Sequence, residues 1–259
     1  MSGRTITSLA NPAVKAARAL HLRKGRDESG LFLAEGLKIV TEAVELGRAP
    51  CLLLYGASAA DHPLLARAAA MARESVEVTP AILAKISRRD NPQTVLGVFE
   101  QAYTPLADLD PAAARCWVAL QAVRDPGNLG TIVRTADAAG CGGVILVGDC
   151  CDPYSVEAVR ATMGSIFAVK IARCGVDAFL AWRRGWPGEV VGTLLTASQD
   201  FRDATYRDPT LILMGNEQAG LPPELEAVCD ATVKIPMRGR ADSLNLAVAT
   251  GVMIYAVTG

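Results

Sequence analysis

The chain has 259 residues, of which 51% are apolar, so it can build one large domain or two ordinary ones and is not an intrinsically disordered protein. Its formal net charge of −1 excludes a strongly basic body, and affinity for nucleic acid would have to come from a local patch. Seven cysteines and two histidines lack CxxC or metal-ligand spacing. We therefore expect no metal site and a reducing, cytoplasmic compartment.

The first hundred residues alternate short helices and strands. Asn11 and Pro12 are typical of a helix N-cap and first position, and we expect Gly25 to end that helix. The elements that follow are expected at 31–34, 51–55, 76–78 and 95–99 (strands) and at 36–46, 61–74 and 80–86 (helices). This alternation predicts a small α/β domain over residues 1–104, then a linker with two prolines at 105–114.

Basic side chains gather at the start of this domain. Six precede Asp27 and no acidic residue does: Arg4, Lys15, Arg18, Arg23, Lys24 and Arg26. Such a segment is either a patch that contacts phosphate or a solvated helix face, and the charges alone do not choose between the two.

The alternation restarts after the linker and predicts a second domain over residues 115–259. Strands are expected at 117–123, 144–147, 166–171, 190–195, 211–214 and 233–235, with helices at 129–139, 155–161 and 243–257 among them. Apolar strands separated by helices are typical of a parallel sheet covered on both faces. The last helix has no charged residue, so we expect it to be buried on every side. It is too short for a membrane span, and we expect no membrane association.

Three segments of the second domain follow the ends of predicted strands. They are 128–140 (NLGTIVRTADAAG), 215–221 (GNEQAGL) and 235–248 (IPMRGRADSLNLAV). Each combines a Gly or Pro turn with polar side chains that can bind a ligand or position a reacting group. Because ligands in open α/β sheets collect beyond the carboxyl ends of strands, we expect the three segments to meet at one pocket.

The polar residues of these segments have both structural and functional interpretations. Asn128 stands where an N-cap would, and Arg134 lies nearly two helical turns further on. The apolar neighbours of Arg134 favour an arginine at a buried edge, for which phosphate or carboxylate is the usual partner. Glu217 projects from a glycine-flanked loop that is either a plain turn or part of a site. Ser243 is the expected N-cap of the last helix, and Asn245 requires a hydrogen-bond partner if buried.

Together the three segments resemble the motifs of the SpoU family of RNA methyltransferases, within the SPOUT superfamily. NLGTIVRTADAAG resembles the first motif, GNEQAGL the second and IPMRGRADSLNLAVATG the third. They occur in the family's order, and no motif residue is missing; Leu246 replaces a commoner valine. Near the N-terminus, ITSLANPAVKAARAL and LFLAEGLKIV are similar to a small ribosomal-protein-like RNA-binding domain that many members carry.

The resemblance implies a fold and an activity beyond what the residues show. It implies a SPOUT-type parallel sheet with a deep trefoil knot that holds S-adenosylmethionine, a homodimer with its active site near the interface, and methylation of a ribose 2′-hydroxyl in RNA. By the family pattern, Gly215, Ile235 and Leu244 contact the cofactor. The active-site set would be Asn128, Arg134, Glu217, Ser243 and Asn245. Ribosomal RNA is favoured over transfer RNA, because an added N-terminal domain in this family often accompanies a large structured target.

The chemistry assigns a role to Arg134. The methyl group of a sulfonium is already activated, so the enzyme must mainly align an oxygen nucleophile and help remove its proton. An arginine is a poor base, so we expect Arg134 to hold a substrate phosphate while the proton acceptor stays open. The alternatives are a transfer-RNA methyltransferase or an RNA-binding or ribosome-assembly protein with a decayed catalytic centre. A nucleotide-dependent oxidoreductase is disfavoured because no GxGxxG opens a helix after a strand.

Overall fold

The computed structural model describes residues 5–259, which divide into two compact units, each with its own sheet. The first unit comprises the chain up to Gln101 together with Asp152–Ala168. The second comprises Ala102–Cys151 and Val169–Gly259. The segment Asp152–Ala168 therefore packs with the first unit, although it lies inside the second domain predicted at 115–259. Arg4 of the basic segment lies outside the described residues.

The first unit is built on a four-stranded mixed sheet with the strand order β1–β4–β2–β3. Its strands are β1 (Leu31–Glu35), β2 (Leu52–Tyr55), β3 (Ser75–Glu77) and β4 (Val95–Glu100). Its helices are α1 (Pro12–Ala19), α2 (Arg23–Ser29), α3 (Leu37–Glu45), α4 (Pro63–Met71), α5 (Pro80–Ser87) and α7 (Val156–Thr162). β4 runs antiparallel to both of its neighbours, whereas β2 and β3 are parallel. The predicted alternation of helices and strands is confirmed.

The first predicted helix is in fact two helices. Asn11 caps α1, its side chain accepting a hydrogen bond from the backbone N–H of Ala13. Gly25 lies inside α2, so its assignment as a helix end was wrong; Gly30, with φ 68°, ends that helix. A Cβ atom at Gly25 would lie 2.4 Å from the carbonyl oxygen of Ala19. Gly25 is thus required where α2 passes close to the end of α1.

All three cations that α2 contributes to the basic segment have carboxylate partners. Arg23 pairs with Asp27 at 3.6 Å and Lys24 with Glu28 at 3.7 Å on the exposed side of the helix. The buried Arg26 donates from Nε to Asp152 Oδ2 at 2.7 Å and from Nη1 to the carbonyl oxygen of Leu20. The ion pair with Asp152 fixes the segment Asp152–Ala168 to α2.

We expect Arg26→Met to lower the free energy of unfolding by about 3 kcal/mol, because it leaves the Asp152 carboxylate without its counter-ion. The side chain of Asp152 is only 10% exposed. Arg23→Met is the matched control on the same helix and should cost less than about 0.5 kcal/mol, since its ion pair is exposed. Urea denaturation at pH 7 measures both variants, and equal losses would contradict this account.

The second unit is built on a seven-stranded sheet with the order β7–β6–β5–β10–β8–β11–β9, and every neighbouring pair is parallel. Its strands are β5 (Cys116–Gln121), β6 (Gly143–Val147), β7 (Lys170–Cys174), β8 (Glu189–Thr193), β9 (Gln199–Asp200), β10 (Thr210–Met214) and β11 (Ala231–Lys234). Its helices are α6 (Pro126–Ala138), α8 (Val176–Arg183), α9 (Pro223–Glu226) and α10 (Leu246–Thr258). The predicted parallel α/β sheet is confirmed.

One strand of this sheet was misplaced by the sequence. The apolar run at 166–171 was expected to be a single strand, but Ser165–Phe167 forms a 3-10 turn and β7 begins at Lys170. The run is apolar for two separate reasons. Phe167 packs against Phe99 at a ring-centroid distance of 4.7 Å in the first unit, whereas Ile171 and Ala172 are buried in the sheet of the second.

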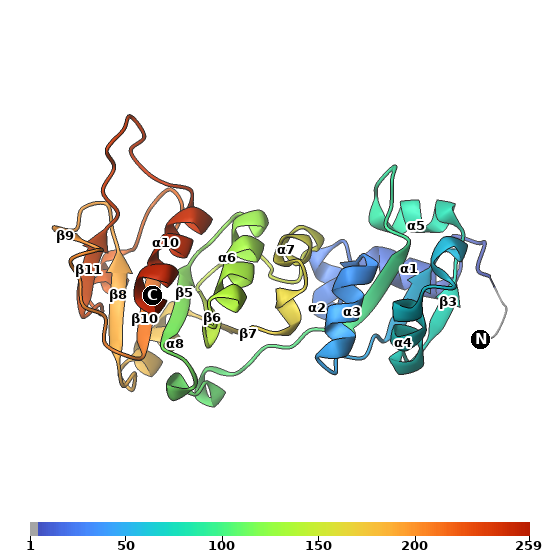
Figure 1. Cartoon of the computed structure of the whole chain (residues 1–259), viewed down its shortest axis with the longest axis horizontal. Helices are drawn as coiled ribbons and strands as arrows, with labels where there is room; N and C mark the ends of the chain where they lie inside the picture. Colours follow the sequence, from blue (N-terminus) through green and yellow to red (C-terminus); the bar gives the residue numbers. More distant parts are fainter. Residues whose placement is uncertain (1–4) are drawn as a thin grey trace. The chain divides into compact units, whose positions relative to one another are not determined.

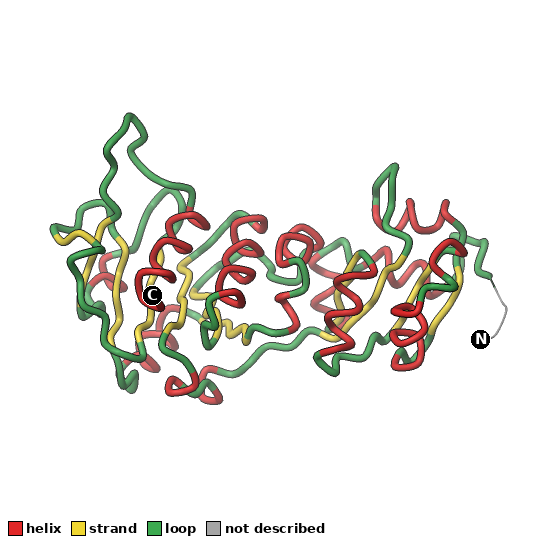
Figure 2. The backbone as a smooth tube through the Cα atoms, viewed as in Figure 1, coloured by secondary structure: helices red, strands yellow, loops and turns green. Residues whose placement is uncertain are grey.

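Helices cover both faces of the parallel sheet. α6 and α10 lie side by side on one face (Figure 1). On the other face, Phe179 of α8 shares a buried cluster with Trp117 and Leu211 of the strands. Figure 2 shows the long loop between β11 and α10 that rises from the sheet before the last helix begins. Because β10 lies between β5 and β8, the ends of these strands, and the segments that follow them, are neighbours.

The last helix differs from its predicted form in two ways. It begins at Leu246 rather than Ser243, with Asn245 as its N-cap. It is also not buried on every side of the single chain, because Val248 is 53% exposed and Tyr255 is 57% exposed. None of the helices within residues 5–259 combines the length and apolar character that crossing a bilayer requires.

Candidate active site

Glu217 joins the second polar segment to the first. Its carboxylate accepts hydrogen bonds from the backbone N–H groups of Arg124 and Asp125 and from Nδ2 of Asn128, at 3.3–3.4 Å. Asn128 Oδ1 in turn accepts a hydrogen bond from Nδ2 of Asn245 at 2.8 Å. The chain of contacts Glu217–Asn128–Asn245 therefore links all three segments, which meet as their positions after strand ends predicted.

The two asparagines reach each other because of where their helices begin. Pro126 takes the first position of α6, so Asp125 is the N-cap and accepts a hydrogen bond from the N–H of Asn128 at 2.6 Å. The prediction of Asn128 as the cap was wrong, and its side chain is free to meet Asn245. The side-chain oxygen of Asn245 caps α10. Ser243 stands outside the helix, and its hydroxyl donates to Asp242 Oδ1 at 3.1 Å.

The loop Gly215–Leu221 is a tight turn held by Asn216. The backbone N–H of Asn216 donates to the carbonyl of Gly220 at 3.1 Å, and the reverse bond is 3.0 Å. Asn216 Nδ2 also donates to the carbonyl of Ala122 at 2.7 Å, which ties the loop to the end of β5. A Cβ atom at Gly215 would lie 2.2 Å from the carbonyl carbon of Gly220. Sequence reasoning singled out the glycines and Glu217 but missed this asparagine.

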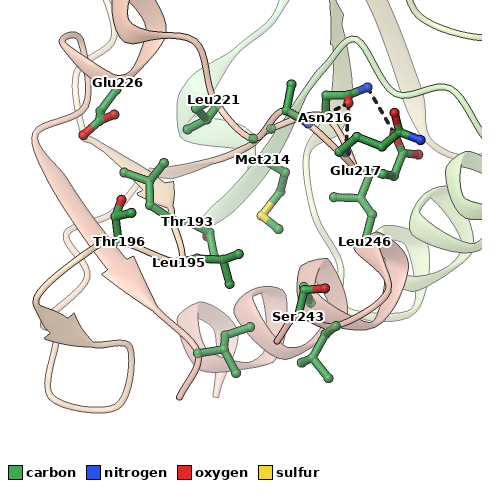
Figure 3. A pocket seen from close by; sticks show the side chains of 18 of the residues that line it. Thr193, Leu195, Thr196, Met214, Asn216, Glu217, Leu221, Glu226, Ser243 and Leu246 are labelled. Carbon is green, nitrogen blue, oxygen red and sulfur yellow. Dashed lines mark hydrogen bonds between the residues drawn. The ribbon is translucent and has the colours of Figure 1, made fainter. Parts of the chain in front are cut away.

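A cavity of about 340 Å³ opens beside this loop (Figure 3). The three residues predicted to contact a cofactor, Gly215, Ile235 and Leu244, all line it, as do Glu217 and Ser243. Sequence reasoning missed another part of the wall, which comes from the end of β8, the segment after it and the end of β10: Thr193, Leu194, Leu195, Thr196 and Met214. The run TLLTAS has no Gly or Pro to mark it as a binding loop.

The hydroxyl of Thr193 is the one buried polar atom of the cavity wall without a hydrogen-bond partner within residues 5–259. Thr193 is the last residue of β8 and pairs with Met214 of β10 and Val233 of β11. A buried hydroxyl without a partner is costly, so its position in a cavity wall indicates that a ligand supplies the partner.

A second hollow, of about 580 Å³, lies against the same loop and also includes Glu217. Arg124 and Asp125 line it beside the end of β5. Arg124 is exposed and donates to Asp149 at 2.8 Å, and the Asp149 carboxylate holds the pKa of this arginine above its ordinary value. Glu217 therefore lines both hollows.

Arg134 does not take part in these contacts. It is exposed on α6, and its side chain makes no hydrogen bond or ion pair with the described part of the chain, so the expectation of a buried edge was wrong. Six residues after Asn128, it lies about 9 Å along the helix and lines neither hollow. Its guanidinium is free to bind an external anion. Within residues 5–259 no group of three or more His, Cys, Asp or Glu side chains could hold a metal ion.

Comparison with known proteins finds a separate family match for each of the two predicted domains. The SpoU rRNA Methylase family matches residues 115–255, and an MRM3-like substrate binding domain matches residues 11–97. An AdoMet-bound rRNA methyltransferase from Sinorhizobium meliloti is 50% identical, with a TM-score of 0.91 over 98% of this chain and 97% of that one. The 23S rRNA (uridine(2479)-2′-O)-methyltransferase of Streptomyces viridochromogenes is 35% identical over 90% of this chain and 84% of its own. With more than half of its length matched by that family, the chain belongs to the SpoU rRNA methylases.

Proposed function

We propose that the protein transfers a methyl group from S-adenosylmethionine to a ribose 2′-hydroxyl in structured RNA. The observation that carries this proposal is the junction Glu217–Asn128–Asn245 beside a cavity lined by Gly215, Ile235 and Leu244. Relatives named for 23S rRNA match 90% and 98% of the chain, whereas an Escherichia coli relative named for tRNA matches 53%. Ribosomal RNA is therefore the favoured substrate.

The cavity fits S-adenosylmethionine in size and in the character of its wall. Its volume lies at the lower end of the roughly 300–1,000 Å³ of small-molecule sites. Leu195, Met214 and Leu246 give apolar surface for a flat base, and the Thr193 hydroxyl gives a polar contact. The absence of a side chain at Gly215 brings the backbone of the loop close to the ligand. When bound, S-adenosylmethionine supplies a methyl group that is already electrophilic.

The residues around the cavity divide into two roles. Glu217, Asn128 and Asn245 are positioning residues, because their polar atoms are engaged with one another and with backbone N–H groups. Ser243, at the edge of the cavity, orients the ribose. Arg134 binds a phosphate of the substrate and so holds the hydroxyl in line with the methyl group.

We also propose that the protein is a cytoplasmic homodimer whose second unit contains a deep trefoil knot. The exposed Val248 and Tyr255 on α10 support the dimer, since an apolar helix face in water favours a partner surface. In such a dimer, Arg134 of one protomer would serve the cavity of the other, since it lines neither hollow of its own chain. Sedimentation equilibrium should give twice the mass of one chain, and Tyr255→Lys should shift the protein to monomer.

A methylation assay tests the proposed function. Purified protein, S-adenosylmethionine and protein-free ribosomal RNA should yield 2′-O-methylated nucleotides that mass spectrometry detects after nuclease digestion. Mapping 2′-O-methyl sites in total RNA from a deletion strain then identifies the nucleotide. Cofactor binding without turnover on any cellular RNA would favour the alternative of an RNA-binding protein with a decayed centre.

We expect Thr193→Val to weaken S-adenosylmethionine binding about tenfold, the equivalent of one hydrogen bond. Valine keeps the shape of the side chain and removes the hydroxyl. The unfolding temperature of the cofactor-free protein should not fall, because the lost hydroxyl has no partner within residues 5–259. Thr193→Ser should keep most of the affinity. Calorimetric titration measures both, and equal affinity of the valine variant and the wild type would refute the contact.

A further inference from the structure

Two exposed arginines at the end of α5 have no ion-pair partner in the described part of the first unit. Arg88 and Arg89 directly follow the last helical residue, Ser87, and both are exposed. Neither side chain makes a hydrogen bond or ion pair with another residue of 5–259. The cations of α2, by contrast, are paired with Asp27, Glu28 and Asp152.

Arg88 occupies a backbone position that disfavours a side chain. It has a φ of 54° and ends α5 in the left-handed region, where glycine is the usual residue. Gly30 fills the equivalent position at the end of α2 with a φ of 68°. The chain thus places a long cation where glycine would relax the backbone. Such an outlier points to a function beyond the local turn.

A purely structural role, in which these arginines donate hydrogen bonds to the last carbonyl groups of α5, is not needed, because other side chains already bind those carbonyls. His21 Nε2 lies within hydrogen-bond distance of the carbonyl oxygen of Ile86, and Arg160 of α7 donates to that of Ser87 at 3.1 Å. Burial chiefly, and then the charges of Arg88 and Arg160, lower the pKa of His21. The guanidinium groups of Arg88 and Arg89 are therefore not needed to close the end of α5.

We propose that Arg88 and Arg89 form a phosphate-binding surface through which the first unit holds the backbone of its RNA substrate. This inference rests on the proposed function and names the part of the chain that recognises the RNA. Arginine suits the role because its guanidinium binds phosphate in a two-pronged geometry. A chain with a net charge of −1 needs such a local patch, since structured RNA is recognised largely through its phosphates and riboses.

The test is the double variant Arg88→Asn/Arg89→Gln in the full-length protein. Asparagine tolerates the left-handed conformation, so the turn is kept while both charges are removed. Affinity for protein-free large-subunit ribosomal RNA should fall about tenfold or more at 0.1 M salt. The slope of log K against log salt should become shallower by about 2, one for each lost phosphate contact. S-adenosylmethionine affinity and the unfolding temperature should equal those of the wild type.

The matched control is Arg23→Gln/Lys24→Gln, which removes the same charge from exposed positions that already have carboxylate partners. It should leave the slope nearly unchanged. If both double variants changed RNA affinity and the salt slope equally, or if Arg88→Asn/Arg89→Gln left the slope unchanged, the proposal of a phosphate-binding surface would be refuted. The two proposals can fail separately. A wild type that methylates RNA while the first variant binds normally refutes only this surface, whereas a wild type that binds RNA through these arginines without methylating it refutes only the activity.

Discussion

Gly215→Ala is expected to raise the dissociation constant for S-adenosylmethionine by about 100-fold or more and to abolish turnover. The new Cβ atom would stand 2.2 Å from the carbonyl carbon of Gly220 and 2.4 Å from the nitrogen of Leu221. Both are backbone atoms, so the loop must move as a whole, and it forms one wall of the cavity. Overpacking of this kind also lowers the free energy of unfolding by about 1–3 kcal/mol. Calorimetric titration and thermal unfolding measure the two effects.

Gly239→Ala provides the control for this variant. Gly239 lies in the loop between β11 and α10, and a Cβ atom there would have open space around it. Its substitution should change neither cofactor affinity nor unfolding temperature measurably. If Gly215→Ala bound S-adenosylmethionine as tightly as this control, the cavity beside Gly215–Leu221 could not be the cofactor site.

Arg134→Ala should lower the turnover number on the order of 10³-fold while the S-adenosylmethionine affinity stays within about twofold of the wild type. Turnover and cofactor affinity should respond differently because Arg134 lines neither hollow, and its guanidinium makes no hydrogen bond or ion pair within residues 5–259. Arg134→Lys keeps the charge but loses the two-pronged geometry, so it should recover only part of the rate. Single-turnover kinetics with saturating cofactor measure the chemical step directly.

Arg184→Ala is the matched control, since Arg184 is likewise exposed and unpaired within residues 5–259, but at the end of α8. It should methylate RNA at the wild-type rate. Parallel losses of turnover and cofactor affinity in Arg134→Ala would refute its assignment to the substrate and place it with the residues that shape the cavity.

The sequence predicted the elements well and their arrangement only in part. Alternation of apolar strands and helices was sufficient for a parallel sheet, and the polar residues after strand ends were sufficient for a shared site. The position of β10 between β5 and β8 depends on pairings far apart in the chain, which no local pattern encodes. The family resemblance, rather than periodicity, supplied the cofactor and the substrate.

The errors have local physical causes. Asn128 and Ser243 were wrongly predicted to be N-caps. Both are residue types that cap helices well, but Asp125 and Asn245 are the N-caps of α6 and α10. Pro126 moved the start of α6 toward the N-terminus, and Asn245 bonds the N–H groups of Ala247 and Val248 at the start of α10. Apolar neighbours suggested that Arg134 was buried, but they face the sheet while the arginine faces water. Thr193 could not be identified from the sequence, because what distinguishes it is a buried hydroxyl without a hydrogen-bond partner, and only the structure shows that.

Two ion pairs, Arg26–Asp152 and Glu35–Arg160, fix Asp152–Ala168 to the first unit. They limit where the chain can be cut to obtain a separate, stable domain. Arg26 and Glu35 are buried, and their partners, Asp152 and Arg160, are encoded after the start of the methyltransferase motifs. A gene fragment that stops at Gln101 would produce a polypeptide with two interior charges left unmatched. The substrate-binding domain is consequently not encoded by one continuous stretch of sequence. A fusion or chimera that includes it must also include residues 152–168.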